Sequence, residues 1–146
     1  MLRRVFIAGM LGAGLTTAAT VSAQALFRTV VEVNSDDPEQ MLRALNIVLE
    51  TGRYHLAYRE SAEIRVIAVG EGLAMLRDDI SPVRDRVASV SRSLPFVSWY
   101  TAVEDVAAVT TATGAAPPLI KGVVMVQEGA GEAERLQADG WSLIRP

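Results

Sequence analysis

The chain has 146 residues, of which 50% are hydrophobic and 21% are charged, with a formal net charge of −3 at pH 7. This length and composition are typical of one globular domain and exclude the disordered and collagen-like classes. The absence of cysteine excludes disulfides, zinc–cysteine sites, iron–sulfur clusters and a cysteine nucleophile. A single histidine excludes a histidine-cluster metal site, although carboxylates alone could hold a hard cation. We expect no metal site and no cofactor.

Residues 1–23 have the pattern of a secretory signal peptide. Arg3 and Arg4 form a basic start, residues 5–21 carry no charge, and Val21-Ser22-Ala23 provides a small-residue cleavage site. We expect cleavage after Ala23, with cleavage after Ala25 as the alternative. A membrane anchor is the other interpretation, but 17 uncharged residues that include three glycines are short for a span.

The route and the destination of export follow from the same segment. Arg3-Arg4-Val5-Phe6-Ile7 resembles the twin-arginine export motif, and general secretion remains equally open. Cleavage removes two of the 14 basic residues and none of the 17 acidic ones, which leaves a net charge of −5. An acidic domain without a basic run is a poor nucleic-acid binder. We therefore expect a periplasmic protein with no nucleic-acid partner and no stable membrane span after cleavage.

The first half of the remaining chain alternates strands with helices. Asp37 and Pro38 suit the N-cap and the first position of a helix. That helix is apolar on most sides, which indicates burial on most sides and a subunit contact besides the sheet. The expected elements are a strand at 29–33, a helix from Pro38 to about Glu50 that stops at Gly52, a strand at 63–69, a short helix at 73–77, and a helix from Ser81-Pro82 to about Ser93.

The second half continues the alternation. We expect a strand at 94–99, a helix from Ala102 to about Thr111, a loop at 114–118, a strand at 122–126, a helix at 132–139 capped by Gly140, and a strand at 141–144. Five strands alternating with helices predict a three-layer, flavodoxin-like α/β fold with a largely parallel sheet. Residues 28–146 form the single domain.

Candidate binding residues lie in three loops at the predicted carboxyl ends of strands, where such sheets bind ligands. The loops are 34–37, 70–72 and 98–101, and their candidates are Asn34, Gly70, Glu71, Gly72, Ser98, Trp99 and Tyr100. Met75 stands where a dinucleotide fingerprint needs its third glycine, so Gly70 and Gly72 are better explained as tight-turn residues. Trp99-Tyr100 could line an apolar pocket or fill a subunit interface, and we favour the interface.

Conventional catalytic groups are few. The adjacent acid pairs 36–37, 78–79 and 104–105 are explained by helix capping and solvation. His55 could act as a general base, but no recognisable nucleophile accompanies it, which favours a surface or packing role. We therefore assign no catalytic residue.

The order of features resembles the DsrE/DsrF-like family over residues 28–146. The resemblance rests on Asn34-Ser35 after the first strand, Asn46 in the apolar helix, the segment 64–73 followed by Leu76, Phe96-Val97-Ser98, Gly122-Val123, and the ending 134–146 with its Leu136-Gln137-x-x-Gly140-Trp141 pattern. This resemblance implies a flavodoxin-like subunit that assembles into trimers or hexamers. It also implies, for sulfur-carrying members, a persulfide-forming Cys in the loop after the third strand.

This chain departs from that family at two points. Trp99 stands at the Cys position, and neither an indole nor the neighbouring serine hydroxyl carries sulfane sulfur as a thiolate does. A cysteine-dependent sulfurtransferase is therefore excluded, whereas an accessory role in sulfur metabolism stays open. The export signal is the second departure, since sulfur relay is usually cytoplasmic.

Two hypotheses follow. The first is an exported, homo-oligomeric DsrE-like protein, a trimer or hexamer, that binds a small-molecule ligand or a partner protein without catalysis. Burial of Trp99 and Tyr100 in a symmetric interface would favour it. The second is an enzyme with a non-thiol site in the loops at the carboxyl ends of the strands. Convergence of His55 or Glu71 with Ser98 on one pocket would favour it.

Overall fold

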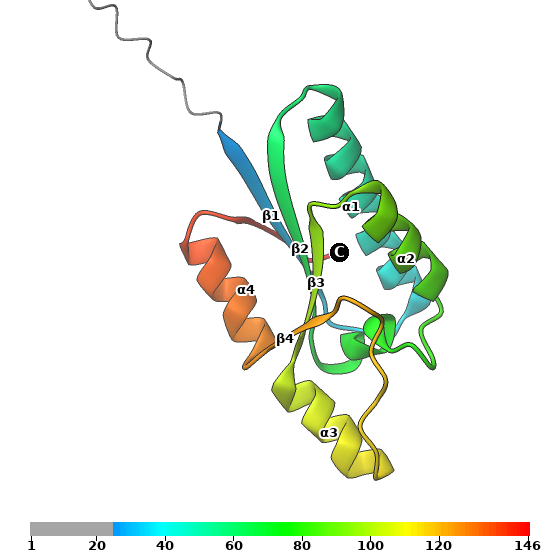
Figure 1. Cartoon of the computed structure of the whole chain (residues 1–146). Helices are drawn as coiled ribbons and strands as arrows, with labels where there is room; N and C mark the ends of the chain where they lie inside the picture. The colour runs from blue at the N-terminus through cyan, green and yellow to red at the C-terminus, as the bar shows by residue number, and fades with distance from the viewer. Residues whose placement is uncertain (1–24) are drawn as a thin grey trace, which may run out of the picture.

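The fold is described from a computed structural model, which covers residues 25–146 (Figure 1). The predicted signal peptide lies outside these residues. In chain order the elements are β1 (Leu26–Val33), α1 (Pro38–Ala57), β2 (Ser61–Ala68), the 3-10 helix η1 (Gly70–Leu76), α2 (Arg84–Ser93), β3 (Val97–Ala102), α3 (Val103–Thr113), β4 (Val124–Val126), α4 (Gly129–Ala138) and β5 (Ser142–Ile144). Within the described part, no helix has the length and apolar character needed to cross a membrane.

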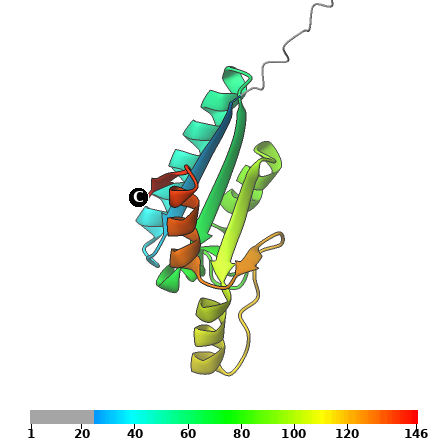
Figure 2. The ribbon, with the colours of Figure 1, turned by 90° about the vertical axis from the view of Figure 1, so that its left-hand side faces the viewer.

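The five strands form one parallel sheet in the order β4-β3-β2-β1-β5. The chain steps in one direction from β1 to β4 and then passes back to β5. Because such crossovers are right-handed, opposite steps place their helices on opposite faces. Figure 2 accordingly shows α4 alone on the face turned to the viewer, with α1 and α2 behind. The predicted three-layer fold is confirmed, although flavodoxin itself has the order 2-1-3-4-5, with the reversal near its start.

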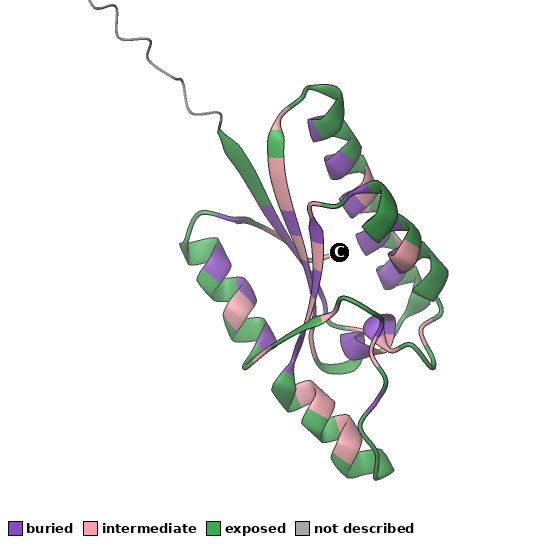
Figure 3. Cartoon of the chain, viewed as in Figure 1, coloured by how far each residue is buried: buried purple, intermediate pink, exposed green. Residues whose placement is uncertain are grey.

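The two faces of the sheet carry cores of different size (Figure 3). The face covered by α1, η1 and α2, here the α1 face, holds a cluster of 18 buried residues. The other face, here the α4 face, holds five: Val30, Ile67, Ala133, Leu136 and Trp141. Leu42, Ile47 and Leu49 of α1 pack against the larger core, so this chain itself uses much of the apolar surface that had suggested a subunit contact on that helix.

Helix α1 is longer than predicted, because Gly52 does not end it. Gly52 is buried, and a Cβ built there would lie 2.5 Å from Leu94 Cδ1. The glycine thus permits the close approach of α1 to the segment after α2. The helix ends one turn later, where Arg59 adopts a φ of 55° and its N–H bonds the carbonyl of Leu56. An αL residue after a helix is usually glycine.

Strand β3 begins and ends three residues later than predicted, at Val97 and Ala102 instead of 94 and 99. Its start is fixed by pairing, since Val97 lies opposite Ile64 of β2. Its end includes the fully buried Thr101, whose hydroxyl donates a hydrogen bond to the Ala68 carbonyl. Residues 98–101 are therefore strand and not the loop that the sequence suggested.

Helix α3 lies on neither face. It follows β3 without a loop and projects beyond the carboxyl edge of the sheet (Figures 1 and 2). None of its 11 residues is buried. It ends at Gly114, whose φ of 80° gives the αL cap typical of helix ends.

Candidate functional site

The structure brings together the candidate residues that follow β1 and β2. The Val69 N–H donates to the Val33 carbonyl over 2.9 Å, which joins the ends of the two strands. A Cβ built on Gly72 would lie 2.0 Å from the Val33 carbonyl oxygen and 3.1 Å from the Asn34 nitrogen. Only glycine fits this contact, so Gly72 seats η1 directly on the end of β1. Asn34 and residues 70–72 thus share the carboxyl edge, as expected.

Gly70 and Glu71 form the exposed part of this edge. Gly70 has a φ of 55° and open space where a side chain would stand, which agrees with a tight-turn role. Glu71 lies in the first turn of η1 and is exposed. Its carboxylate is therefore available to a ligand or to a partner at this edge.

Gln40 completes the carboxyl edge and was missed from the sequence. Its amide nitrogen donates to the Asn34 side chain and to the Pro146 carbonyl, both over 3.1 Å, and its oxygen accepts from the Ser35 N–H. The Asp37 carboxylate caps α1 through the Glu39 N–H. Gln40 is three residues beyond that cap, the capping-box position, and this spacing was the available signal. Gln40 bridges β1 and β5 at the point where the strand order reverses, a favoured ligand position in α/β sheets.

Ser98, Trp99 and Tyr100 do not join that edge. Trp99 points to the α1 face, is 3% exposed, and donates from Nε1 to the Ser91 hydroxyl over 2.8 Å. It therefore fills the core of its own subunit, and the expectation that it lines a pocket or a symmetric interface is wrong. Ser98 and Tyr100 lie on the α4 face, because neighbouring strand residues point to opposite sides.

A polar cluster centred on Arg65 occupies the α4 face beside Tyr100. The Arg65 guanidinium lies 4.7 Å from the centroid of the Trp141 ring and 5.3 Å from that of Tyr100. It pairs with Glu63 at 2.9 Å and with Glu132 at 3.7 Å. The Arg135 guanidinium, by hydrogen bonding, holds the pKa of Glu132 below its ordinary value. The alternating charges of Glu63 and Arg65 in an apolar strand were the signal that sequence reasoning passed over.

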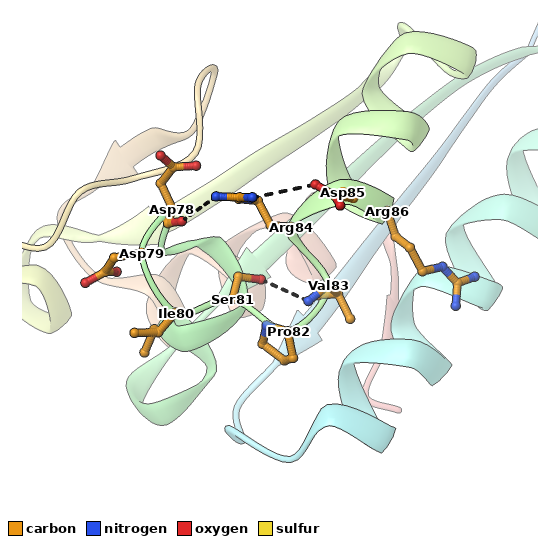
Figure 4. Close-up of a pocket in the computed structure, with 9 residues that line it drawn as sticks. All are labelled: Asp78, Asp79, Ile80, Ser81, Pro82, Val83, Arg84, Asp85 and Arg86. Carbon is orange, nitrogen blue, oxygen red and sulfur yellow. Dashed lines mark hydrogen bonds and ion pairs between the residues drawn. The ribbon is translucent and has the colours of Figure 1, made fainter.

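Two of the surface hollows in residues 25–146 are lined by three or more charged residues. The first, of about 290 Å³, is lined by residues 78–86 between η1 and α2 (Figure 4). Several of its polar groups already have partners: Arg84 contacts the Asp78 carbonyl and the Asp85 carboxylate, and the Ser81 hydroxyl accepts from the Val83 N–H. The second, of about 460 Å³, lies between the end of β4 and the start of α4 and is lined by residues 125–128, Gly131, Glu132 and Arg135. It combines apolar with charged groups and has the size of a ligand site.

His55 lies at the opposite edge of the sheet. It is buried near the end of α1, stacks on Phe27 with 4.7 Å between ring centroids, and its Nδ1 lies 2.7 Å from a Glu60 carboxylate oxygen. Glu71 follows β2 at the carboxyl edge, and Ser98 lies within β3. These three candidate groups therefore do not converge on one centre. Within residues 25–146, no cluster of three or more acids and histidines is placed to hold a metal ion.

Comparisons with solved structures find neighbours of this fold. No family model and no curated protein matches the chain. The chain is similar to MTH1491 from Methanobacterium thermoautotrophicum, a solved protein of unknown function, with a TM-score of 0.67 and 28% sequence identity. The match covers 82% of this chain and 99% of that protein. It supports the α/β fold and carries no function with it.

Proposed function

We propose that the protein is an exported DsrE-like subunit that assembles with copies of itself and binds a small ligand or a partner protein, without persulfide chemistry. The observation that carries this proposal is the exposure of α3 and of the outer edge of β4. Isolated helices as short as α3 are marginal in water, and none of its residues is buried in this chain. A second copy against α3 and β4 would supply the missing contacts.

The exposed side chains of these two elements suit such an interface. Val103, Val124 and Met125 are 39%, 47% and 53% exposed. Strand β4 is also an edge strand, so one row of its backbone groups lacks a strand partner within residues 25–146. Apolar side chains beside an open strand edge favour protein–protein contact over contact with solvent.

The DsrE-like assignment rests on the resemblance in sequence, and the fold gives its most specific motif a physical role. Leu136 and Trp141 both lie in the core of the α4 face. The Trp141 N–H bonds the Leu136 carbonyl, and Gly140 between them adopts a φ of 92°. The Leu-Gln-x-x-Gly-Trp ending therefore specifies the turn that seats α4 on the sheet.

Binding is favoured over catalysis by the arrangement of the polar groups. The chain has no thiol, and Trp99, at the position expected for a sulfur-carrying Cys, is enclosed in the core. His55, Glu71 and Ser98 lie apart, so the non-thiol enzyme lacks a common centre. The hollow of about 460 Å³ beside β4 is our candidate ligand position, because it adjoins the proposed interface. The family resemblance leaves an accessory role in sulfur metabolism open, and growth of a deletion strain on reduced sulfur sources tests it.

Sedimentation velocity tests the assembly. We expect the wild type to form trimers or hexamers, and the double variant Val103→Asp/Met125→Asp to shift the association at least tenfold toward monomer. Leu56→Asp is the matched control, since Leu56 has a similar exposure of 52% at the opposite edge. A wild type that stays monomeric at high concentration, or an association unaffected by the double variant, would contradict the proposal.

A further inference from the structure

Exposed aromatic and aliphatic side chains gather at the amino edge of the sheet. Five of the nine large hydrophobic residues that are exposed in the described part of the chain lie there, at the start of β1 and the end of α1. We call Leu26, Phe27, Tyr54, Leu56 and Tyr58 the amino-edge patch; their exposed fractions run from 41% to 65%. This patch is separate from α3 and β4, which lie toward the carboxyl edge (Figures 1 and 3).

The aromatic part of the patch is a continuous and supported surface. The Phe27 ring stacks on the His55 ring. The Tyr54 ring contacts the His55 ring edge-on, with 5.4 Å between centroids, and the Tyr58 ring lies 4.7 Å from the Tyr54 ring, also between centroids. His55 is buried and held by Glu60, so it forms a floor under the exposed rings. The three rings of Phe27, Tyr54 and Tyr58 therefore have fixed neighbours, and each remains more than 40% exposed.

The position of the patch along the chain indicates which surface it contacts. Residues 5–21 carry no charge and are expected to enter a membrane during export. Only residues 22–25 separate them from β1, and four residues span at most about 14 Å. Whenever residues 5–21 occupy a bilayer, the amino edge is held within that reach of its surface. The far end of α3 lies on the order of 40 Å away, from strand and helix rises.

The composition of the patch also suits contact with a bilayer surface. Tyrosine and phenylalanine are favoured at the headgroup level of a bilayer, and arginine side chains extend beside them toward the phosphates. Arg53 and Arg59 are exposed next to Tyr54 and Tyr58. We propose that, before the signal peptide is removed, the amino-edge patch rests on the lipid bilayer surface while residues 5–21 occupy the membrane. The contact is mainly apolar, so salt does not disrupt it.

The absence of cysteine allows a direct test in the full chain. The chain carrying Ala57→Cys, or Ala112→Cys on α3, is labelled with an environment-sensitive dye and reconstituted into phosphatidylethanolamine–phosphatidylglycerol vesicles that contain a headgroup-attached nitroxide quencher. Both positions are exposed. We expect quenching at residue 57 to exceed that at residue 112 several-fold, and to survive ~0.5 M salt, where screening is nearly complete.

A patch variant separates true contact from mere tethering. Tyr54→Ser/Leu56→Ser/Tyr58→Ser should lower the quenching at residue 57 by more than half, whereas Ile80→Ser, which lies outside both the patch and the proposed interface, should leave it unchanged. Circular dichroism verifies that both variants stay folded. Equal quenching in the patch variant and the wild type would overturn the proposal, because tethering alone would explain it. Energy transfer between dyes at residue 57 of two copies, without quenching by lipid, would overturn it in favour of a second copy.

Discussion

The two faces of the sheet differ in how completely this chain covers them. On the α1 face, α1, η1 and α2 cover a core of 18 buried residues. On the α4 face, one short helix covers a core of five buried residues. Trp99 and Tyr100 are adjacent in β3, yet the first is enclosed and the second is partly exposed beside Arg65. We infer that the core on the α1 face contributes most of the free energy of unfolding. The α4 face and the carboxyl edge remain open to partners.

The largest expected effect is a difference in unfolding free energy between a variant of Trp99 and a variant of Tyr100. Trp99→Ala removes a buried ring and should lower the free energy of unfolding by about 3 to 5 kcal/mol. Tyr100→Ala should cost only about 1 kcal/mol, since its ring is already partly hydrated. Urea unfolding measures both. Similar losses for the two variants would contradict the asymmetry between the faces.

The next effect concerns how η1 is seated against β1. Gly72→Ala should cost about 3 kcal/mol or more, because the new Cβ would meet the backbone oxygen of Val33. Gly70→Ala is the matched control and should cost about 1 kcal/mol, since only its positive φ opposes a side chain. Thermal unfolding distinguishes them, and a tolerated Gly72→Ala would mean that the contact between β1 and η1 is looser than described.

On the α4 face, Glu32 offers a smaller test. The residue is 5% exposed, and its carboxylate accepts from Arg145 Nε over 3.0 Å. Arg145→Ala should destabilise the protein by about 1 to 3 kcal/mol, because it leaves the buried Glu32 carboxylate without its partner. Adding Glu32→Gln should recover part of the loss. If Arg145→Ala alone had no effect on urea unfolding, water would already satisfy Glu32.

The smallest effect is a dependence on pH. The folded pKa of Glu132 is lowered by Arg135, so its contribution to stability is present above the ordinary carboxyl pKa of 4.5 and is lost as the pH falls through the lowered value. Between about pH 5 and about pH 3 the wild type should therefore lose more stability than Arg135→Gln. Melting temperatures across this range measure the difference. If melting temperature depended on pH in the same way in both proteins, the Glu132–Arg135 pair would not contribute to the pH dependence.

Local signals in the sequence predicted the fold well. The Asp37-Pro38 pair marks the start of α1 because a cap and a fixed φ are properties of neighbouring residues. The alternation of strands and helices is also a local signal, and it predicted the parallel sheet. The error at β3 has a tertiary cause, since residues 94–99 and 97–102 both suit a strand and only pairing with β2 selects the second.

The candidate site was predicted only in part, for related reasons. Asn34 and residues 70–72 were found because they follow apolar runs that end in turn residues. Gln40 and Arg65 carried local signals but were missed, since those signals do not reveal their distant partners Pro146 and Trp141. Gly52 was misread because a glycine that ends a helix and one that permits close packing look alike in sequence.

Native mass spectrometry of the processed protein from its own periplasm is the decisive test of assembly and ligand binding. We predict a ring of identical subunits that carries an additional mass, and that mass would identify the ligand. The ring should be lost in Val103→Asp/Met125→Asp and retained in Leu56→Asp. A bare monomer for the wild type would contradict the account, and α3 and β4 would then need a different protein as partner.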